Sequence, residues 1–110
     1  MTPAEFWVEL DAALRALDRA GLPAMGPDDL HGGIEDCMSC SLAALEADGV
    51  DTKGPFVFYH SQDRDPLRAQ CLLAWSGEHT PLRLATELAR RGLTCELPIN
   101  ETVRIRVFPS

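Results

Sequence analysis

Two cysteines set two residues apart carry the clearest chemistry in this sequence. Cys37 and Cys40 stand in the order Cys-Met-Ser-Cys, where a helix is expected to begin. Thiols at a helix N-terminus lie near backbone N–H groups that lack helical partners. This favours the thiolate that both redox chemistry and zinc binding require. The carboxylates of Glu35 and Asp36 would oppose that effect, so the electrostatic support for either chemistry is mixed.

Each of these two chemistries lacks one expected feature. A thioredoxin-like dithiol follows a strand directly, whereas Cys37 follows an irregular acidic connector. A tetrahedral zinc site usually has a second close pair of ligands. The other cysteines and histidines are instead scattered along the chain, at Cys71, Cys95, His31, His60 and His79. We therefore expect no cofactor, and the alternative is a zinc ion held by Cys37, Cys40 and one or two histidines.

A run of polar residues, His60-Ser61-Gln62-Asp63, closes an aromatic segment. Loops at strand ends often carry functional groups, and Gln62 is a candidate binding residue. His60 could act as a base oriented by Asp63, with Cys37 or Cys40 as the nucleophile. The interpretation that we favour is simpler: Asp63 caps the turn and His60 packs at the strand end. The order of the residues does not decide between the two, because triads are recognised by geometry.

Three further residues with distinctive chemistry are expected to be structural. Cys71 and Cys95 each alternate with apolar residues, as buried cysteines that act as small hydrophobes do. Trp7 lies beside the main apolar stripe of the first helix and is a candidate contact residue. A place at the edge of the core is the interpretation favoured for Trp7.

Composition restricts the class of protein. The net charge of −7 argues against nucleic-acid binding, which needs a basic face. No apolar run approaches the roughly 20 residues of a membrane helix, and residues 1–9 lack the core of a signal peptide. We expect a cytoplasmic protein without membrane contact and with reduced cysteines. Arginine supplies nine of the ten basic residues, which is typical of proteins from GC-rich bacterial genomes.

The acidic charge is concentrated in the first half of the chain. Residues 1–53 hold 11 acidic and 3 basic residues, whereas residues 54–110 hold 6 and 7. An acidic half of this kind could steer a basic protein partner. The alternative, which we favour, is that acidic helix surfaces keep the protein in solution.

Helix signals occur three times. Thr2-Pro3-Ala4-Glu5 is a capping box with proline at the first helical position, and Gly21 ends the helix expected over 3–20. An irregular connector over 22–36 leads to a second helix over about 37–48. Thr80-Pro81 and Gly92 bound a third helix over about 81–91.

Strand signals fill the rest of the second half. An aromatic run over 56–59, a turn over 60–66 and an apolar run over 70–75 predict two strands, and the second should be central in the sheet. Alternation over 93–97 and 103–107 predicts a final hairpin. The expected fold is one α+β domain over 1–110, with two N-terminal helices followed by β-β-α-β-β. We expect a four-stranded, mainly antiparallel sheet with its helices packed on one face.

Together, the cysteine motif and the segment from 57 to 63 resemble an uncharacterised bacterial family of unknown function, over roughly residues 30–108. In that family a C-C-x-x-C motif precedes an aromatic strand that ends in H-x-Q-D. The matching positions here are Cys37, Cys40, His60, Gln62 and Asp63, whereas Asp36 replaces the first cysteine. The resemblance supplies no activity, and it implies that these five residues lie together, with the second helix beside the end of the first strand.

We expect a small binding or interaction domain of unknown specific function, for which the acidic half is the candidate surface for a protein partner. The alternative is a thiol-dependent redox or hydrolytic enzyme, or a zinc-binding domain, centred on Cys37, Cys40 and His60. Whether the protein is an enzyme, and in what oligomeric state it acts, is left open by the sequence.

Overall fold

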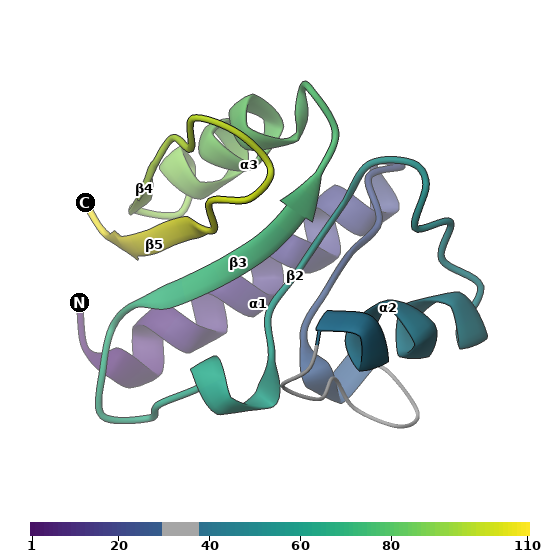
Figure 1. Cartoon of the computed structure of the whole chain (residues 1–110). Helices are drawn as coiled ribbons and strands as arrows, with labels where there is room; N and C mark the ends of the chain where they lie inside the picture. The colour runs from purple at the N-terminus through teal and green to yellow at the C-terminus, as the bar shows by residue number, and fades with distance from the viewer. Residues whose placement is uncertain (30–37) are drawn as a thin grey trace.

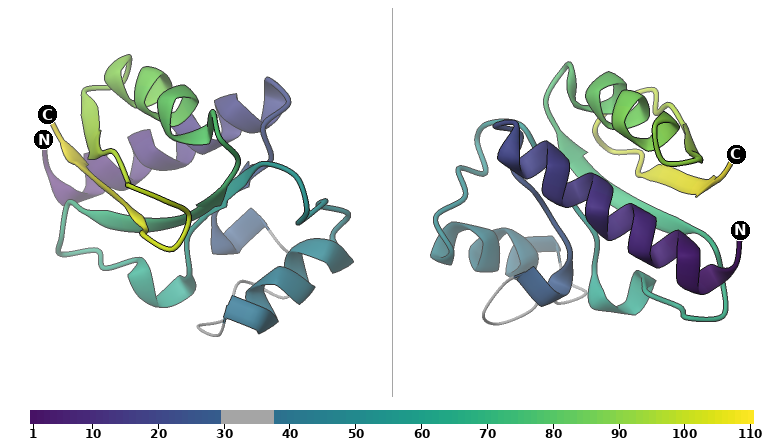
Figure 2. Two further views of the ribbon diagram at one scale, coloured as in Figure 1. Left: turned by 45° about the horizontal axis from the view of Figure 1, so that its top comes forward. Right: turned by 180° about the vertical axis from the view of Figure 1, so that it is seen from behind.

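The computed structural model describes residues 1–29 and 38–110, apart from the side chains of residues 38–41. The fold is α+β, with a five-stranded sheet in the order β1-β2-β3-β5-β4 (Figures 1 and 2). The strands are β1 (Ala24–Met25), β2 (Phe56–Phe58), β3 (Cys71–Ser76), β4 (Leu93–Glu96) and β5 (Ile105–Pro109). The helices are α1 (Pro3–Arg19), α2 (Met38–Ala47) and α3 (Thr80–Ala89), with 3₁₀ turns η1 (Pro27–Asp29) and η2 (Ser61–Asp63).

The main core lies between one face of the sheet and helices α1 and α3. The apolar stripe of α1, which includes Leu10 and Leu14, is fully buried against Val57 of β2 and Leu73 of β3. Ile105 of β5 lies directly opposite Leu73 of β3, and residues paired in this way share a face of the sheet. Ile105 therefore belongs to the same cluster. The apolar residues that the sequence predicts on one side of the helices and on one face of the strands therefore pack together in one core.

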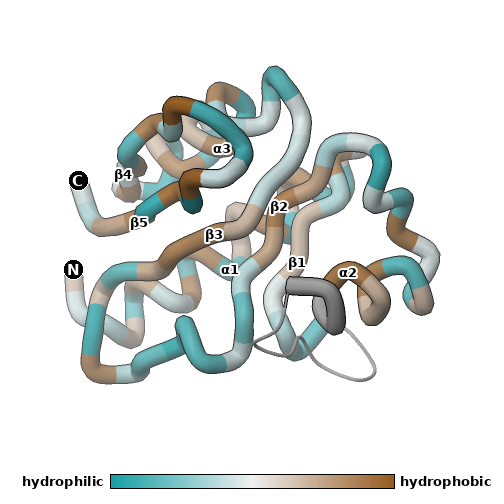
Figure 3. Tube along the Cα trace, in the orientation of Figure 1, coloured by the Kyte–Doolittle hydropathy of each residue, from teal (hydrophilic) through white to brown (hydrophobic). Residues whose placement is uncertain are grey.

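The opposite face of the sheet carries a second, smaller core beneath α2. Leu45 of α2 is fully buried and packs with Phe56 and Phe58 of β2 and with Ala74 of β3. The view from behind in Figure 2 has α1 crossing in front of the sheet, whereas α2 lies beyond it. Figure 3 shows hydrophobic residues along β2 and β3, the strands that lie between these layers.

Three details of the expected fold are wrong. The described residues form five strands and not four, because the connector contains β1, which pairs in parallel with β2. β1 and η1 separate the two N-terminal helices. The helices cover both faces of the sheet rather than one, since the side chains of Phe56 and Phe58 need a cover opposite α1.

Other features agree with the sequence. The side chain of Thr2 accepts a hydrogen bond from the N–H of Glu5, and the Glu5 carboxylate accepts one from the N–H of Thr2, which completes the predicted capping box. After α1 the chain turns at Gly21, whose φ of 96° is strained for residues with a Cβ. β3 is the third of five strands, so its predicted central place is confirmed.

The final hairpin begins at Leu93 as predicted, but its second strand starts later than expected. β5 begins at Ile105, and Val103 instead belongs to the loop that connects β4 to β5. The indole N–H of Trp75 donates a 2.8 Å hydrogen bond to the carbonyl of Val103, which anchors that loop to β3. None of the helices within residues 1–29 and 38–110 has the length and apolarity to span a bilayer.

Candidate functional site

His60 lies two residues beyond the end of β2 and is completely buried, with 0 % of its surface exposed. Its ring packs edge-on against Phe58, with 5.4 Å between the ring centres. Neither ring nitrogen has a hydrogen-bond partner among the described residues. Buried polar atoms in folded proteins nearly always have partners, so this imidazole needs an explanation.

The turn η2 brings Asp63 back towards His60. The backbone N–H of Asp63 donates to the carbonyl of His60 at 3.0 Å, and the backbone N–H of His60 donates to Oδ2 of Asp63 at 3.3 Å. The same Oδ2 lies 3.4 Å from Nδ1 of His60 and 3.3 Å from Nη1 of Arg104. Asp63 thus caps the turn, as expected, and also faces one side of the imidazole while Arg104 balances its charge.

The predicted cysteine partners of His60 lie at the limit of the described residues. Cys37 is outside them, and Cys40 belongs to the first turn of α2 with its thiol outside them as well. The N-terminal end of α2 is directed towards the end of β2 that precedes His60 (Figures 1 and 2). The described backbone is thus compatible with the neighbourhood that the family resemblance implies.

The two remaining cysteines belong to the main core. Cys71 is 2 % exposed, and burial raises the pKa of its thiol, with further contributions from the carboxylates of Asp63 and Asp11. Cys95 is half-buried against the same cluster, and burial raises its pKa too. A buried thiol held in its neutral form is a poor nucleophile, so both cysteines act as small apolar residues.

Gln62 and Trp7, the two candidate binding residues, lie in different surroundings. Gln62 is exposed and lines a cavity of about 220 Å³ together with Asp63, Arg68 and Arg106. Trp7 is only 5 % exposed. Its indole N–H donates to the carbonyls of Asp65, at 2.9 Å, and Arg68, at 3.1 Å. Trp7 therefore secures the loop after η2 and offers little contact surface.

A second polar cluster was not predicted from the sequence. The buried hydroxyl of Tyr59 donates to Oδ1 of Asp11 at 2.8 Å. Arg64 bridges Asp11 and Asp28, each at 2.7 Å, and its guanidinium lies 5.7 Å from the Trp7 ring centre. Burial, followed by the bond to Asp11, raises the pKa of Tyr59. Because the cluster joins residues far apart in the chain, no local spacing could reveal it.

The two clusters differ in one respect that matters for function. In the Asp11 cluster the phenol, the guanidinium and both carboxylates have partners, as in a structural clamp. The imidazole of His60 has no hydrogen bond within the described residues. His60 is consequently the stronger candidate for a group that binds something else.

Many acidic side chains of residues 1–53 bond within the fold. They pair with arginines or accept backbone N–H groups: Asp11 and Asp28 with Arg64, Glu9 with Arg91, Asp18 with Ala24 and Asp29 with Gly26. These carboxylates have structural roles that do not require a basic partner.

Within the described ranges, no three histidine, cysteine or acidic side chains are grouped so as to hold a metal ion. Comparisons with protein-family models, with curated proteins and with solved structures find no match to this chain.

Proposed function

We propose that the protein is a small zinc-binding domain whose metal site joins the end of β2 to the start of α2. The observation that carries this proposal is the fully buried His60, with two ring nitrogens that lack hydrogen-bond partners among the described residues. A buried polar group without a partner costs about 1–3 kcal/mol, and a metal ion on one nitrogen would remove that cost. Neutral imidazole is a common zinc ligand.

The surroundings of His60 fit a ligating histidine. Histidines that bind metals usually direct the second ring nitrogen to a carboxylate or carbonyl, which fixes the tautomer and orients the ring. Asp63, with Oδ2 at 3.4 Å from Nδ1, supports this role, and Nε2 is then the nitrogen left for the metal. Nη1 of Arg104 lies 3.3 Å from the same Oδ2, so this carboxylate also has a cationic partner.

The cysteine pair would supply two further ligands to the zinc ion. A C-x-x-C motif supplies two zinc ligands, and a helix N-terminus favours their thiolate form. Cys37, Cys40 and His60 would give three ligands. A second histidine, or a water molecule as in catalytic zinc sites, would take the fourth place.

Metal analysis of the purified protein tests the proposal. We expect about one zinc ion per chain, as a four-ligand site built from one set of residues binds one ion. His60→Ala and Cys40→Ser should lose the metal, whereas His79→Ala, which removes an exposed histidine, should keep it. Cobalt substitution should give thiolate-to-metal absorption in the wild type and in His79→Ala, but not in His60→Ala or Cys40→Ser. Protein that contains no zinc and takes up none on reconstitution would overturn the proposal.

Thiol chemistry is the second candidate, and Asp63 also supports it. A nucleophile, a base and a group that orients the base form the usual arrangement, and His60 with Asp63 would supply the last two. The cysteine at the start of α2 would then react with iodoacetamide faster than an ordinary thiol. His60→Ala should abolish that excess in metal-free protein, and uniformly slow thiols in the wild type argue against this candidate.

A protein partner for the acidic half is a further proposal with weaker support. The bonds of Asp11, Asp28 and Asp18 within the fold account for much of the acidic composition without a partner. A pull-down that recovers a basic protein, and loses it at high salt, would favour this role over a purely structural one.

A further inference from the structure

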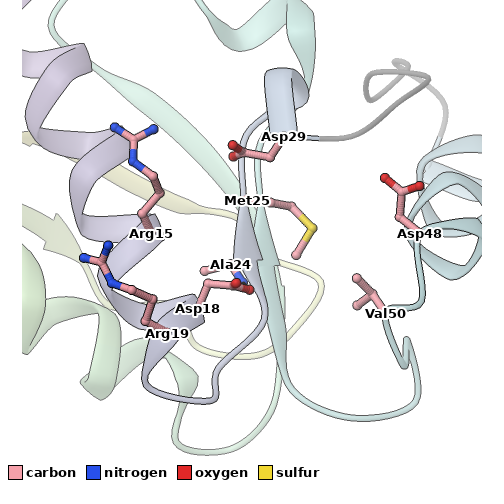
Figure 4. Close-up of a pocket in the computed structure, with 8 residues that line it drawn as sticks. All are labelled: Arg15, Asp18, Arg19, Ala24, Met25, Asp29, Asp48 and Val50. Atoms are coloured by element: carbon pink, nitrogen blue, oxygen red, sulfur yellow. The ribbon is translucent and has the colours of Figure 1, made fainter.

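A cavity of about 490 Å³ lies over β1, a terminal strand of the sheet. Its volume is within the roughly 300–1,000 Å³ that is usual for small-molecule sites. Figure 4 shows its lining: one wall from α1, a floor from β1, and a second wall from the segment that follows α2. The lining residues are Arg15, Asp18, Arg19, Ala24, Met25, Asp29, Asp48 and Val50, none of which belongs to the His60 site.

The edge of β1 is closed to a further strand. The N–H of Ala24 donates to Oδ1 of Asp18 at 3.2 Å, and the N–H of Gly26 donates to Oδ2 of Asp29 at 2.8 Å. An extended peptide that joined the sheet would need such backbone groups. The cavity therefore suits a compact molecule rather than a β-strand.

Two arginines on α1 place positive charge at the cavity. Arg15 and Arg19 are exposed, lie one helical turn apart and line the same cavity. Within the described residues neither side chain has a hydrogen bond or an ion pair, whereas Arg64, Arg91 and Arg104 are all paired with carboxylates. Like charges at this spacing destabilise a helix slightly, and a bound anion would relieve the repulsion. Guanidinium groups are well suited to a carboxylate.

The rest of the lining restricts what that anion can be. Ala24 and Met25 form an apolar floor but are buried and expose little surface, whereas Val50 is half-buried and offers an apolar side chain to the cavity. Three carboxylates and two guanidiniums line the cavity, so its formal charge is negative overall. A dianion such as phosphate would be repelled by that lining. A ligand with one carboxylate and one ammonium group would match both signs of charge.

We propose that this cavity binds a free amino acid with an apolar side chain. Its carboxylate would lie at Arg15 and Arg19, its ammonium group would face Asp29, and its side chain would extend across β1 towards Val50 on the opposite wall (Figure 4). The carboxylate of Asp29 can accept further hydrogen bonds while it holds the N–H of Gly26.

Titration of ¹⁵N-labelled protein with L-leucine, followed by NMR, tests the site. We expect saturable shifts of the Ala24, Met25 and Val50 amides. N-acetyl-leucine lacks the ammonium group and leucinamide lacks the carboxylate, so both should bind at least about tenfold more weakly, as should inorganic phosphate. The proposal is overturned if leucine gives no saturable shifts at millimolar concentration, or if any of these three compounds binds as tightly as leucine.

Matched variants identify the binding groups. The double variant Arg15→Gln/Arg19→Gln should weaken leucine binding at least about tenfold. Because both side chains are exposed, its circular dichroism spectrum should equal that of the wild type. Arg106→Gln removes another exposed arginine, on β5, and should leave leucine affinity unchanged. Equal affinity in the double variant overturns the proposal. His60→Ala should bind leucine normally, which separates this site from the zinc site.

Discussion

The hydroxyl of Tyr59 donates a 2.8 Å hydrogen bond to Asp11, which joins the end of β2 to the middle of α1. Asp11 also pairs with Arg64 at 2.7 Å, so a single carboxylate links three segments of the chain. The buried phenol and the carboxylate satisfy each other, and removal of either leaves a polar group without its partner.

Tyr59→Phe should therefore destabilise the protein by about 1–2 kcal/mol, although the ring and its packing are kept. Urea denaturation monitored by circular dichroism measures the change. In a double-mutant cycle with Asp11→Ala, which removes the acceptor, the two effects should not add, because the residues share one bond. Additive effects would show that the hydrogen bond contributes nothing of its own.

Glycine at position 26 allows the chain to pass close to Tyr59. A Cβ added to Gly26 would lie 2.9 Å from the edge of the Tyr59 ring, closer than carbon atoms pack. Gly26→Ala should cost about 1–3 kcal/mol through displacement of that ring. Gly54→Ala is the control, since its Cβ would meet Asp51 at an ordinary 3.6 Å. Thermal unfolding should separate the two variants, and equal melting temperatures would contradict the close approach.

Stability should fall in alkaline solution because of Cys71. Burial raises the pKa of this thiol, so the folded protein keeps a proton that the unfolded chain releases above about pH 8.5. The stabilisation is complete below that pH and is lost as the pH rises, at up to about 1.4 kcal/mol per pH unit for one proton. Urea denaturation between about pH 8 and 10 measures this slope.

Cys71→Ala is the matched variant for this slope. It should be less stable than the wild type near neutral pH, because it leaves a small cavity in the core. Its stability should nevertheless fall less steeply between about pH 9 and 10, since no thiol remains at this position to release a proton. Parallel curves for the two proteins would show that Cys71 does not titrate as its burial predicts.

Removal of the proposed zinc ion should weaken the fold. A metal that binds only the folded chain adds its binding free energy to stability, so a strong chelator should lower the melting temperature. A shift of at least about 5 °C is expected, which corresponds to about 1 kcal/mol in a domain of this size. His60→Ala should not respond to the chelator, and His79→Ala should respond as the wild type does. A wild type that is indifferent to the chelator would contradict the metal site.

The sequence predicted those parts of the fold that local spacing encodes. The capping box at Thr2 and the apolar stripe of α1 are properties of neighbouring residues, and the structure confirms both. β1 was not predicted, because its two residues, Ala24 and Met25, are too few to show the alternation of apolar and polar residues that marks a strand. Its partner is β2, more than thirty residues further along the chain, and only the complete fold brings the two together.

The position of α2 over the second face of the sheet was not predicted either, because it depends on contacts between residues far apart in the chain. The apolar run that predicted a central strand implied burial on both sides, and α2 provides the cover that the expected fold lacked. For the candidate site, the sequence singled out His60 and Asp63, and their 3.4 Å separation follows from the η2 turn between them. The burial of His60 depends on tertiary packing, so no spacing within 60–63 could have predicted it.

The place of β5 in the sheet has a consequence for how the chain folds. β5 pairs with β3 on one side and with β4 on the other, yet it follows both of them in the chain. Until residues 105–109 are available, β3 lacks one of its neighbours and β4 lacks the one neighbour that it has among the described strands. β4 therefore cannot join the sheet until β5 has been synthesised, and a nascent chain that ends before Ile105 would leave the β5-facing edges of β3 and β4 open to other molecules.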